Sequence, residues 1–136
     1  MSGEDHHWRR IGSFLLLADE ERESAARLIA THPRQAAFFQ QQSVEKLLRA
    51  IIEFENVVAG PTHNLGALTD LLGREHPMRK RFGEFDDLSA AASRFRYPSG
   101  HGSVPQVSSD ALLKKQTEIV KLAIEVKSFI GPLKKH

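Results

Sequence analysis

The sequence predicts an all-α protein, an antiparallel up-and-down bundle of four or five helices with one long loop before the last helix. Apolar residues recur at the three- and four-residue spacings of amphipathic helices along most of the chain, and the alternation typical of strands is absent. Glycine and proline gather between these periodic stretches, where they end helices. At 136 residues the chain has the length of one domain with its own core, so we treat residues 1–136 as a single domain.

The first two predicted helices are the longest. Residues 8–30 present an apolar stripe, and Pro33 ends this stretch because a proline cannot continue the hydrogen-bond ladder of a helix. Residues 35–56 form the second helix. Its first turns carry Phe38 and Phe39 beside the main apolar face, which gives this helix a wider apolar surface than a single bundle seam hides.

Caps and glycines divide the middle of the chain. We expect the Gly-Pro pair at residues 60–61 to close the second helical region, and Asn64 to cap a short third helix that stops at Gly73. Residues 78–95 again repeat apolar side chains at helical spacing. Gly83 divides this stretch into two pieces, because an interior glycine weakens a helix by about 1 kcal/mol relative to alanine.

A long loop precedes the last predicted helix. The helical pattern stops at residues 94–107, where proline, glycine and serine dominate. Ser108 or Ser109 caps the last helix, and Gly131 stops it. Loops of this length without structure of their own are usually functional, which directs attention to the segment.

Charge is nearly balanced, with 19 Lys and Arg against 17 Asp and Glu. The two signs are unevenly distributed, and six basic residues fall in one region: Arg74, Arg79, Lys80, Arg81, Arg94 and Arg96. We therefore expect any anion-binding site to be local rather than a uniformly positive face. The alternative for the run at residues 79–81 is a solvated helix face.

Several classes of chemistry find no support in the sequence. There is no cysteine, so disulfides and thiolate metal sites are excluded. Neither a phosphate-binding glycine loop, a metalloprotease motif nor a carboxylate cluster at metal-ligand spacing occurs. We expect no metal and no cofactor. The only N-terminal apolar run, residues 14–18, is short for a signal segment or a membrane span, so we expect a cytoplasmic protein.

Three motifs occur in a recognisable order: QQSVEKLLRA at residues 41–50, THNL at residues 62–65, and RYP at residues 96–98. In this combination the chain resembles the HEPN family, the higher eukaryote and prokaryote nucleotide-binding domains, over nearly its whole length. The resemblance implies a helical bundle that often forms homodimers. It also implies binding of RNA or a nucleotide phosphate, for which we expect Arg94, Tyr97 and His63 to supply contacts.

Many members of this family are metal-independent ribonucleases that carry an arginine and a histidine with four to six residues between them. Here Arg96 and His101 have four residues between them, and Arg94 and His101 have six. By resemblance, His101 would move the proton of an RNA 2′-hydroxyl, and Arg96 would hold the phosphate in the transition state. Such an enzyme would be the toxin of a toxin–antitoxin pair whose partner is a small nucleotidyltransferase.

The alternative is a non-catalytic interaction module that supports the nucleotidyltransferase. Two departures from the nuclease pattern favour it: Tyr97 follows the arginine where nucleases carry a smaller polar residue or histidine, and His101 lies between two glycines ahead of the last helix. Structural roles are open as well. Tyr97 can anchor the loop, His63 can tie its segment to a neighbouring helix, and Glu45 can pair with Lys46 on a helix surface.

The glutamine pair raises a separate question. Gln41 and Gln42 lie on a largely apolar helix, and a buried amide needs hydrogen-bond partners. We expect the Arg-Tyr-Pro loop to supply them.

Overall fold

The computed structural model describes residues 3–132 and confirms the all-α bundle. The helices are α1 (Gly3–Leu28), α2 (Pro33–Phe54), α3 (Leu65–Thr69), α4 (Arg79–Gly83), α5 (Asp87–Arg96) and α6 (Ser109–Ile130). The described residues contain no strand. Two of the helices, α3 and α4, have only 5 residues each, so the bundle is built mainly from the other four.

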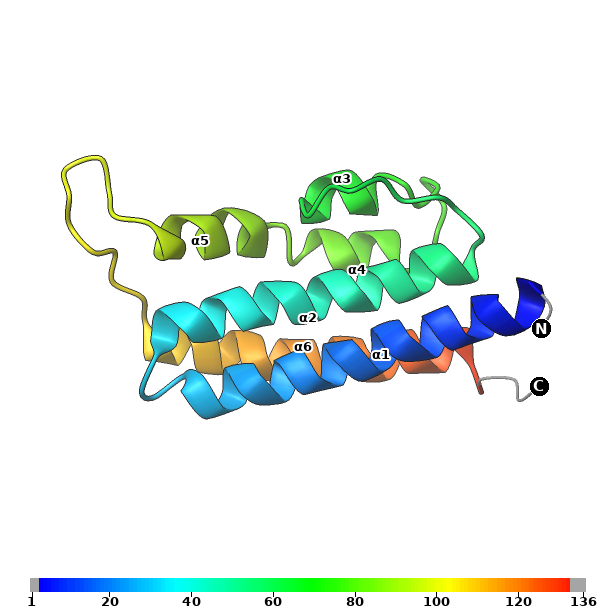
Figure 1. Cartoon of the computed structure of the whole chain (residues 1–136), viewed down its shortest axis with the longest axis horizontal. Helices are drawn as coiled ribbons and strands as arrows, with labels where there is room; N and C mark the ends of the chain where they lie inside the picture. Colours follow the sequence, from blue (N-terminus) through cyan, green and yellow to red (C-terminus); the bar gives the residue numbers. More distant parts are fainter. Residues whose placement is uncertain (1–2, 133–136) are drawn as a thin grey trace.

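The central helix of the bundle is α2, which contacts α1, α5 and α6. Figure 1 shows that α1 and α2 run in opposite directions, that α4 and α5 return along α2, and that α6 then runs in the direction of α2. The bundle therefore has up-and-down topology, and its third helical segment is divided into α4 and α5. The segment between α5 and α6 projects from one end of the bundle (Figure 1).

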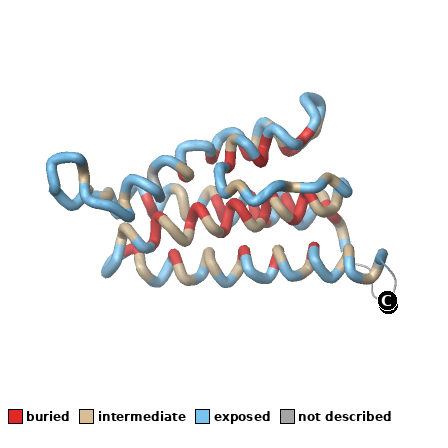
Figure 2. Tube along the Cα trace, turned by 45° about the horizontal axis from the view of Figure 1, so that its top comes forward, coloured by how far each residue is buried: buried red, intermediate tan, exposed pale blue. Residues whose placement is uncertain are grey.

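The core follows the inner face of α2, where buried residues are concentrated (Figure 2). Its largest fully buried apolar side chains are Ile11, Leu47, Leu48, Ile51, Ile52, Leu65, Leu68, Phe82, Phe85, Ile119 and Leu122. Burial of each such side chain contributes roughly 1.5–3 kcal/mol, which provides the main stabilisation of a chain that has no disulfide. A smaller cluster of Ile29, Ala36, Ala37 and Leu112 lies apart from this core.

The end of α2 differs from the prediction that Gly60 and Pro61 close the helical region. The helix ends at Phe54, and Asn56 adopts a positive φ of 59°. The N–H of Asn56 donates to the carbonyl of Glu53, and the N–H of Val57 donates to that of Ile52, at 3.0 and 3.1 Å. This is a Schellman motif with asparagine in the left-handed position, and it stops the helix before the glycine is reached.

The predicted caps are confirmed at three positions. The side chain of Asn64 accepts a hydrogen bond from the N–H of Ala67 and begins α3, and Ser108 accepts one from Ala111 and begins α6. Gly131, with φ of 79°, follows the last residue of α6. The division of residues 78–95 is also confirmed, since α4 ends at Gly83.

The loop before α6 begins later than predicted. Helix α5 continues through Arg96, so Arg94 and Arg96 belong to its last turn, where positive side chains are favourable to the helix dipole. Within the loop, the N–H of Ser99 donates to the carbonyl of Ser103 and that of Gly102 donates to Ser99, both at 2.8 Å. The loop therefore has a defined turn at its tip. Among the described residues, none of the helices has the length and apolar character needed to cross a membrane.

Candidate functional site

His101 lies in the turn at the tip of the projecting loop. Its N–H donates to Oγ of Ser99 at 3.3 Å, and the hydroxyls of Ser99 and Ser103 are 2.7 Å apart. The backbone of the histidine is thus held in the turn. Its imidazole is exposed and makes no contact with Arg94 or Arg96 in the described structure. The structure does not join the arginine and histidine that the sequence spacing pairs.

Arg96 is held instead by aromatic rings. Its guanidinium carbon lies 4.7 Å from the ring centroid of Phe38 and 5.9 Å from that of Tyr97. The guanidinium of Arg94 lies 4.9 Å from the ring of its neighbour Phe95. No carboxylate among the described side chains forms an ion pair with either arginine. Both positive charges are therefore uncompensated and partly ordered, a state suited to binding an anion.

The first turns of α2 and the end of α5 together form a shallow pocket beneath Arg96. Its lining residues are Arg34, Gln35, Phe38, Phe39, Phe95 and Arg96. The pocket measures about 530 Å³, and the rings of Phe38 and Phe39 meet edge to face at 5.7 Å. We call these six residues and Tyr97 the arginine–aromatic surface. Arg34, like Arg96, has no carboxylate partner among the described side chains.

Arg34, Phe38 and Phe95 are not predicted as site residues from the sequence. The feature of the sequence that could have indicated this surface is the extra apolar area of Phe38 and Phe39. Aromatic rings that do not fit into the helix interface of the bundle must pack elsewhere or stay exposed. Tyr97 extends the surface outward, with 63% of its area exposed. Its ring contributes to the platform for Arg96 rather than being buried against the bundle.

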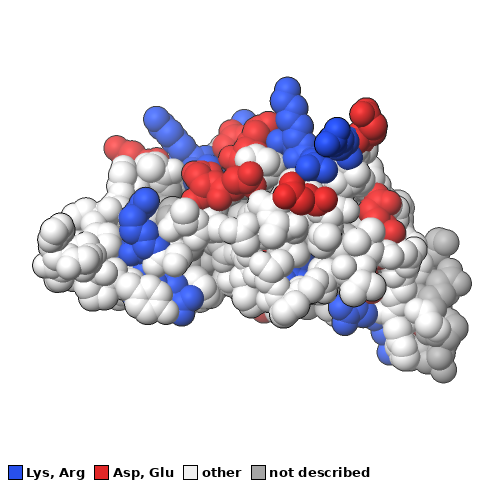
Figure 3. Space-filling model, turned by 90° about the horizontal axis from the view of Figure 1, so that it is seen from above, with Lys and Arg blue, Asp and Glu red and all other residues white. Residues whose placement is uncertain are grey.

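The basic residues near α4 have a structural role. Arg81 pairs with Glu84, Glu118 and Glu125 at 2.9, 3.2 and 2.8 Å, and Arg79 pairs with Asp70 at 3.1 Å. Figure 3 shows basic and acidic side chains interspersed over the face that carries α3, α4 and α5. Two arginines of the run at residues 79–81 are thus neutralised by neighbours, which leaves them poorly suited to binding a phosphate.

A second polar cluster lies further along α2. Glu45 is buried in the middle of this helix, with 2% of its side chain exposed. Its Oε1 accepts from Nε2 of Gln41 at 3.1 Å, and its Oε2 accepts from Nε of Arg49 at 3.0 Å. Nδ1 of His63 lies 3.0 Å from the same Oε2, although 75% of the histidine side chain is exposed. His63 therefore ties the segment before α3 to α2, as one of the structural alternatives predicts.

The backbone of this segment is anchored separately. Nη2 of Arg49 donates to the carbonyl of Thr62 at 2.6 Å, and Nε2 of Gln41 donates to the carbonyl of His63 at 3.1 Å. The N–H of Leu65 donates to Oγ of Ser89 in α5 at 2.9 Å. The segment is thus fixed from both α2 and α5.

Buried Gln41 and half-buried Gln42 find partners within α2 and in the THNL segment, and the prediction that the Arg-Tyr-Pro loop satisfies them is wrong. Nε2 of Gln42 donates to Oε1 of Gln41 at 2.7 Å, and Nζ of Lys46 donates to Oε1 of Gln42 at 3.2 Å. Glu45 does not pair with Lys46, whose ion-pair partner is Glu21 in α1 at 2.9 Å.

Glu21 begins a continuous chain of hydrogen-bonded side chains that ends at His63. Burial raises the pKa of the Glu21 carboxyl above its usual value although Lys46 opposes the shift, and the charge of Glu45 adds to it. Its second oxygen, Oε2, is buried without a hydrogen-bond partner. The chain connects α1 to the segment before α3 through α2 and fixes the polar side chains of α2, of which Gln41 and Glu45 are buried.

The two clusters lie on the same face of α2. Phe38, which carries Arg96, and Glu45, which holds His63, are seven residues apart in the sequence, close to two helical turns and roughly 10.5 Å along the axis. Arg96 and His63 are therefore arranged along one side of the helix. Among the described side chains, the ring of His63 is held by a hydrogen-bond partner on α2, whereas the ring of His101 has none.

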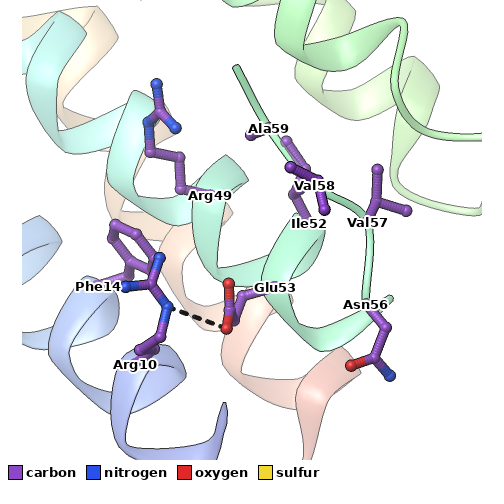
Figure 4. Close-up of a pocket in the computed structure, with 9 residues that line it drawn as sticks. All are labelled: Arg10, Phe14, Arg49, Ile52, Glu53, Asn56, Val57, Val58 and Ala59. Atoms are coloured by element: carbon purple, nitrogen blue, oxygen red, sulfur yellow. Dashed lines mark hydrogen bonds and ion pairs between the residues drawn. The ribbon is translucent and has the colours of Figure 1, made fainter. Parts of the chain in front are cut away.

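A pocket of about 330 Å³ continues beyond Arg49 toward the end of α2. Figure 4 shows its lining, with Arg10 and Phe14 from α1, Arg49, Ile52 and Glu53 from α2, and the valines of the following segment. Arg10 is neutralised there by Glu53, its Nε lying 3.0 Å from the carboxylate. No group of three or more potential metal ligands occurs among the described residues.

The structure is thus a small all-α bundle in which Arg96 stacks on Phe38 and His63 is held by Glu45. The sequence matches the HEPN domain family over residues 13–131. The chain belongs to this family, as its motifs indicate. It is also similar to the crystal structure of an archaeal HEPN homologue, with a TM-score of 0.60 and 15% identity over 89% of this chain and 98% of that chain. This likeness shows a shared fold. Comparison with curated proteins gives no match.

Proposed function

We propose that this HEPN domain binds single-stranded RNA, or the phosphate of a nucleotide, at the arginine–aromatic surface. The observation that carries the proposal is the Arg96 guanidinium, stacked on Phe38 without a carboxylate partner among the described side chains. An arginine held in this way can donate to phosphate oxygens, while exposed rings such as that of Tyr97 stack on a base. Arg34, on the same pocket, supplies a second positive charge.

The proposal is tested by measuring fluorescence anisotropy of a labelled single-stranded RNA of mixed sequence with the wild-type protein and two variants. Arg96→Ala and Arg34→Ala each remove a phosphate contact and are expected to weaken binding about tenfold and to lower the salt dependence of the affinity. Arg9→Ala is the matched control, because this exposed arginine lies near the N-terminal end of α1 and is not part of the arginine–aromatic surface. Equal affinities of Arg96→Ala and Arg9→Ala would show that the surface does not bind RNA.

The nucleotide alternative is tested by titrating ATP and GTP into the protein in the absence of RNA. The surface would be assigned to free nucleotides if two results are found together. The wild type would bind ATP or GTP but no RNA, and Arg96→Ala would have a higher Kd for the nucleotide. Binding of neither ligand by the wild-type protein would leave the non-catalytic interaction module as the better description.

The finer predictions from the resemblance remain predictions. They are metal-independent ribonuclease activity with Arg96 and His101 as catalytic residues, nucleotide contacts by Arg94, Tyr97 and His63, a homodimer, and pairing with a small nucleotidyltransferase. Sedimentation equilibrium measures the oligomeric state directly. An RNA cleavage assay in EDTA measures the activity, with Arg96→Ala and His101→Ala as the variants that should abolish it.

A further inference from the structure

We infer that the arginine–aromatic surface selects the terminal phosphomonoester of an RNA strand over the phosphodiesters within the strand. The inference rests on the proposed function, because it names the part of the RNA that this surface recognises. A terminal phosphomonoester carries a charge of about −1.5 to −2 at pH 7 and has three oxygens free to accept hydrogen bonds, whereas a phosphodiester carries one negative charge. The two groups therefore differ in the positive charge and in the donors that they require.

Two arginines from different helices line one pocket of this surface. Arg34 belongs to the first turn of α2 and Arg96 to the last turn of α5, and Figure 1 shows these two helix ends at the same end of the bundle. Both residues line the pocket of about 530 Å³, and Arg94 adds a third positive charge in the last turn of α5. Because arginine stays protonated in proteins, the pocket carries more positive charge than one phosphodiester neutralises.

The side-chain hydrogen-bond donors of these arginines are free. None of the three donates to a described residue or pairs with a described carboxylate. Arg96 and Arg94 instead lie over the rings of Phe38 and Phe95, at 4.7 and 4.9 Å. A cation–π contact uses the charge of a guanidinium and leaves its five N–H groups available. Two such groups match the three acceptor oxygens of a terminal phosphate better than the two of a phosphodiester.

Unpaired positive charge does not continue along the two helices that leave this pocket. The other cations of α2 are Lys46 and Arg49. Lys46 pairs with Glu21 at 2.9 Å, and Arg49 pairs with Glu45 at 3.0 Å. On α5, no cation precedes Arg94. Proteins that hold single strands along their length use a positively charged groove that follows the backbone. The unpaired cations of α2 and α5 are gathered at one pocket, which suits one phosphate better than a row of them.

The size and the lining of the pocket also favour the end of a strand. Pockets for small molecules measure about 300–1,000 Å³, so a pocket of about 530 Å³ has the size for one nucleotide. The rings of Phe38, Phe39 and Phe95 line it, and Tyr97 is 63% exposed. Aromatic rings stack on any of the bases. A terminal nucleotide would therefore bind through its phosphate and its base, whichever base it carries.

The test compares RNAs that share one sequence and differ only in their ends, by fluorescence anisotropy with the label on an internal base. One strand has hydroxyls at both ends, one has a 5′-phosphate, one has a 3′-phosphate, and one is circular. We expect one of the phosphate-ended strands to bind at least about tenfold more tightly than the hydroxyl-ended strand. The circular strand, which has no end, should bind as weakly as the hydroxyl-ended one. Comparison of the 5′ and 3′ strands identifies the end that is recognised.

A methyl ester on the preferred terminal phosphate separates the effect of its second charge from the presence of a phosphate. The esterified end carries one negative charge, like a phosphodiester within the strand. We expect the esterified strand to bind as weakly as the hydroxyl-ended strand. This measurement uses the wild-type protein alone, so it does not depend on the folding of any variant.

Variants assign the preference to the pocket. Arg34→Ala and Arg96→Ala should each reduce the ratio of the affinities for the phosphate-ended and hydroxyl-ended strands to about threefold or less, because each removes a charged donor. Arg9→Ala is again the control and should keep the full ratio, since this exposed arginine of α1 does not line the pocket.

Four results would each overturn the inference. They are equal affinities for the phosphate-ended and hydroxyl-ended strands, a circular strand that binds as tightly as the phosphate-ended ones, full affinity of the esterified strand, and a ratio that either arginine variant retains. The proposed function fails on a different result. If Arg96→Ala weakens the binding of all four RNAs equally, the surface binds RNA without selecting its end. If Arg96→Ala binds every RNA like the wild type, RNA does not bind at this surface.

Discussion

The guanidinium of Arg96 lies 4.7 Å from the ring of Phe38, so a charge at the end of α5 is supported by an aromatic residue in the first turns of α2. The two residues are far apart in the sequence and meet only in the folded bundle. Their contact turns a flexible side chain into part of a surface with defined geometry. This relationship underlies the first prediction.

Phe38→Ala is expected to weaken binding of single-stranded RNA about tenfold, because it removes both a stacking ring and the support for Arg96. Fluorescence anisotropy with labelled RNA measures the change. Ile124→Ala is the control, since it removes an exposed apolar side chain from α6 outside this surface. An equal loss of affinity in both variants would assign the effect to stability rather than to the site.

Arg81→Met is expected to lower the free energy of unfolding by about 1–2 kcal/mol. Arg81 joins α4 to α6 through Glu118 and Glu125, and its guanidinium also lies 5.3 Å from the ring of Phe85. Urea denaturation followed by circular dichroism measures the difference. Arg74→Met, at an exposed arginine without an ion pair among the described side chains, should change the unfolding free energy by less than about 0.5 kcal/mol.

Asp19→Asn is expected to lower the free energy of unfolding by about 1 kcal/mol near neutral pH. In acid, the variant and the wild type should be equally stable. Partial burial alone would raise the pKa of Asp19, but hydrogen bonds from Lys127 and Arg22 outweigh it and hold the pKa below its usual value of 3.8. Because the pKa is lower in the folded state, the carboxylate stabilises the fold at pH values above the pKa of the unfolded chain. This contribution is lost as the pH falls through the pKa of the folded protein. Urea unfolding of the wild type and the variant, from neutral pH down into acid, measures whether their unfolding free energies converge. A difference in unfolding free energy that stays constant at all pH values would contradict the prediction.

Two glycine-to-alanine substitutions should change the stability of the protein in opposite directions. Gly83 lies at the end of α4 with open space around its Cα and no positive φ, so Gly83→Ala should stabilise the protein by about 0.5–1 kcal/mol. Gly131 has open space as well, but its φ is 79°. Gly131→Ala should therefore destabilise by about 1 kcal/mol, because a side chain is strained in that conformation. Thermal unfolding measures both, and a stabilising Gly131→Ala would show that the end of α6 adapts to the substitution.

Much of the fold could be predicted from the sequence because its signals are local. Apolar spacing predicts the long helices, and the caps at Asn64 and Ser108 are recognised from side chains that bond their own backbone three residues later. The end of α2 at Phe54 lies two residues before the predicted end at residue 56, but the residue that ends the helix was predicted to be Gly60, whereas Asn56 adopts the conformation usually left to glycine. A left-handed asparagine leaves no clear pattern in a sequence.

The candidate site was predictable only in part. Arg94, Arg96, Tyr97 and His63 were identified by their motifs, and the structure places each of them at the surface. The partners of these residues were not predictable. Arg34 and Phe38 precede the QQSVEKLLRA motif, and their contribution depends on how closely α5 packs against α2.

The sequence by itself determined the helical bundle, most of its helix ends and its place in the HEPN family, because periodicity, caps and motifs act over a few residues. Only the tertiary structure decided which histidine has an oriented ring. His101 and Arg96 are close in the sequence but are not joined, since a loop separates them. His63 meets Glu45 because the segment after α2 folds back along that helix, where Arg49 and Gln41 bind its carbonyls.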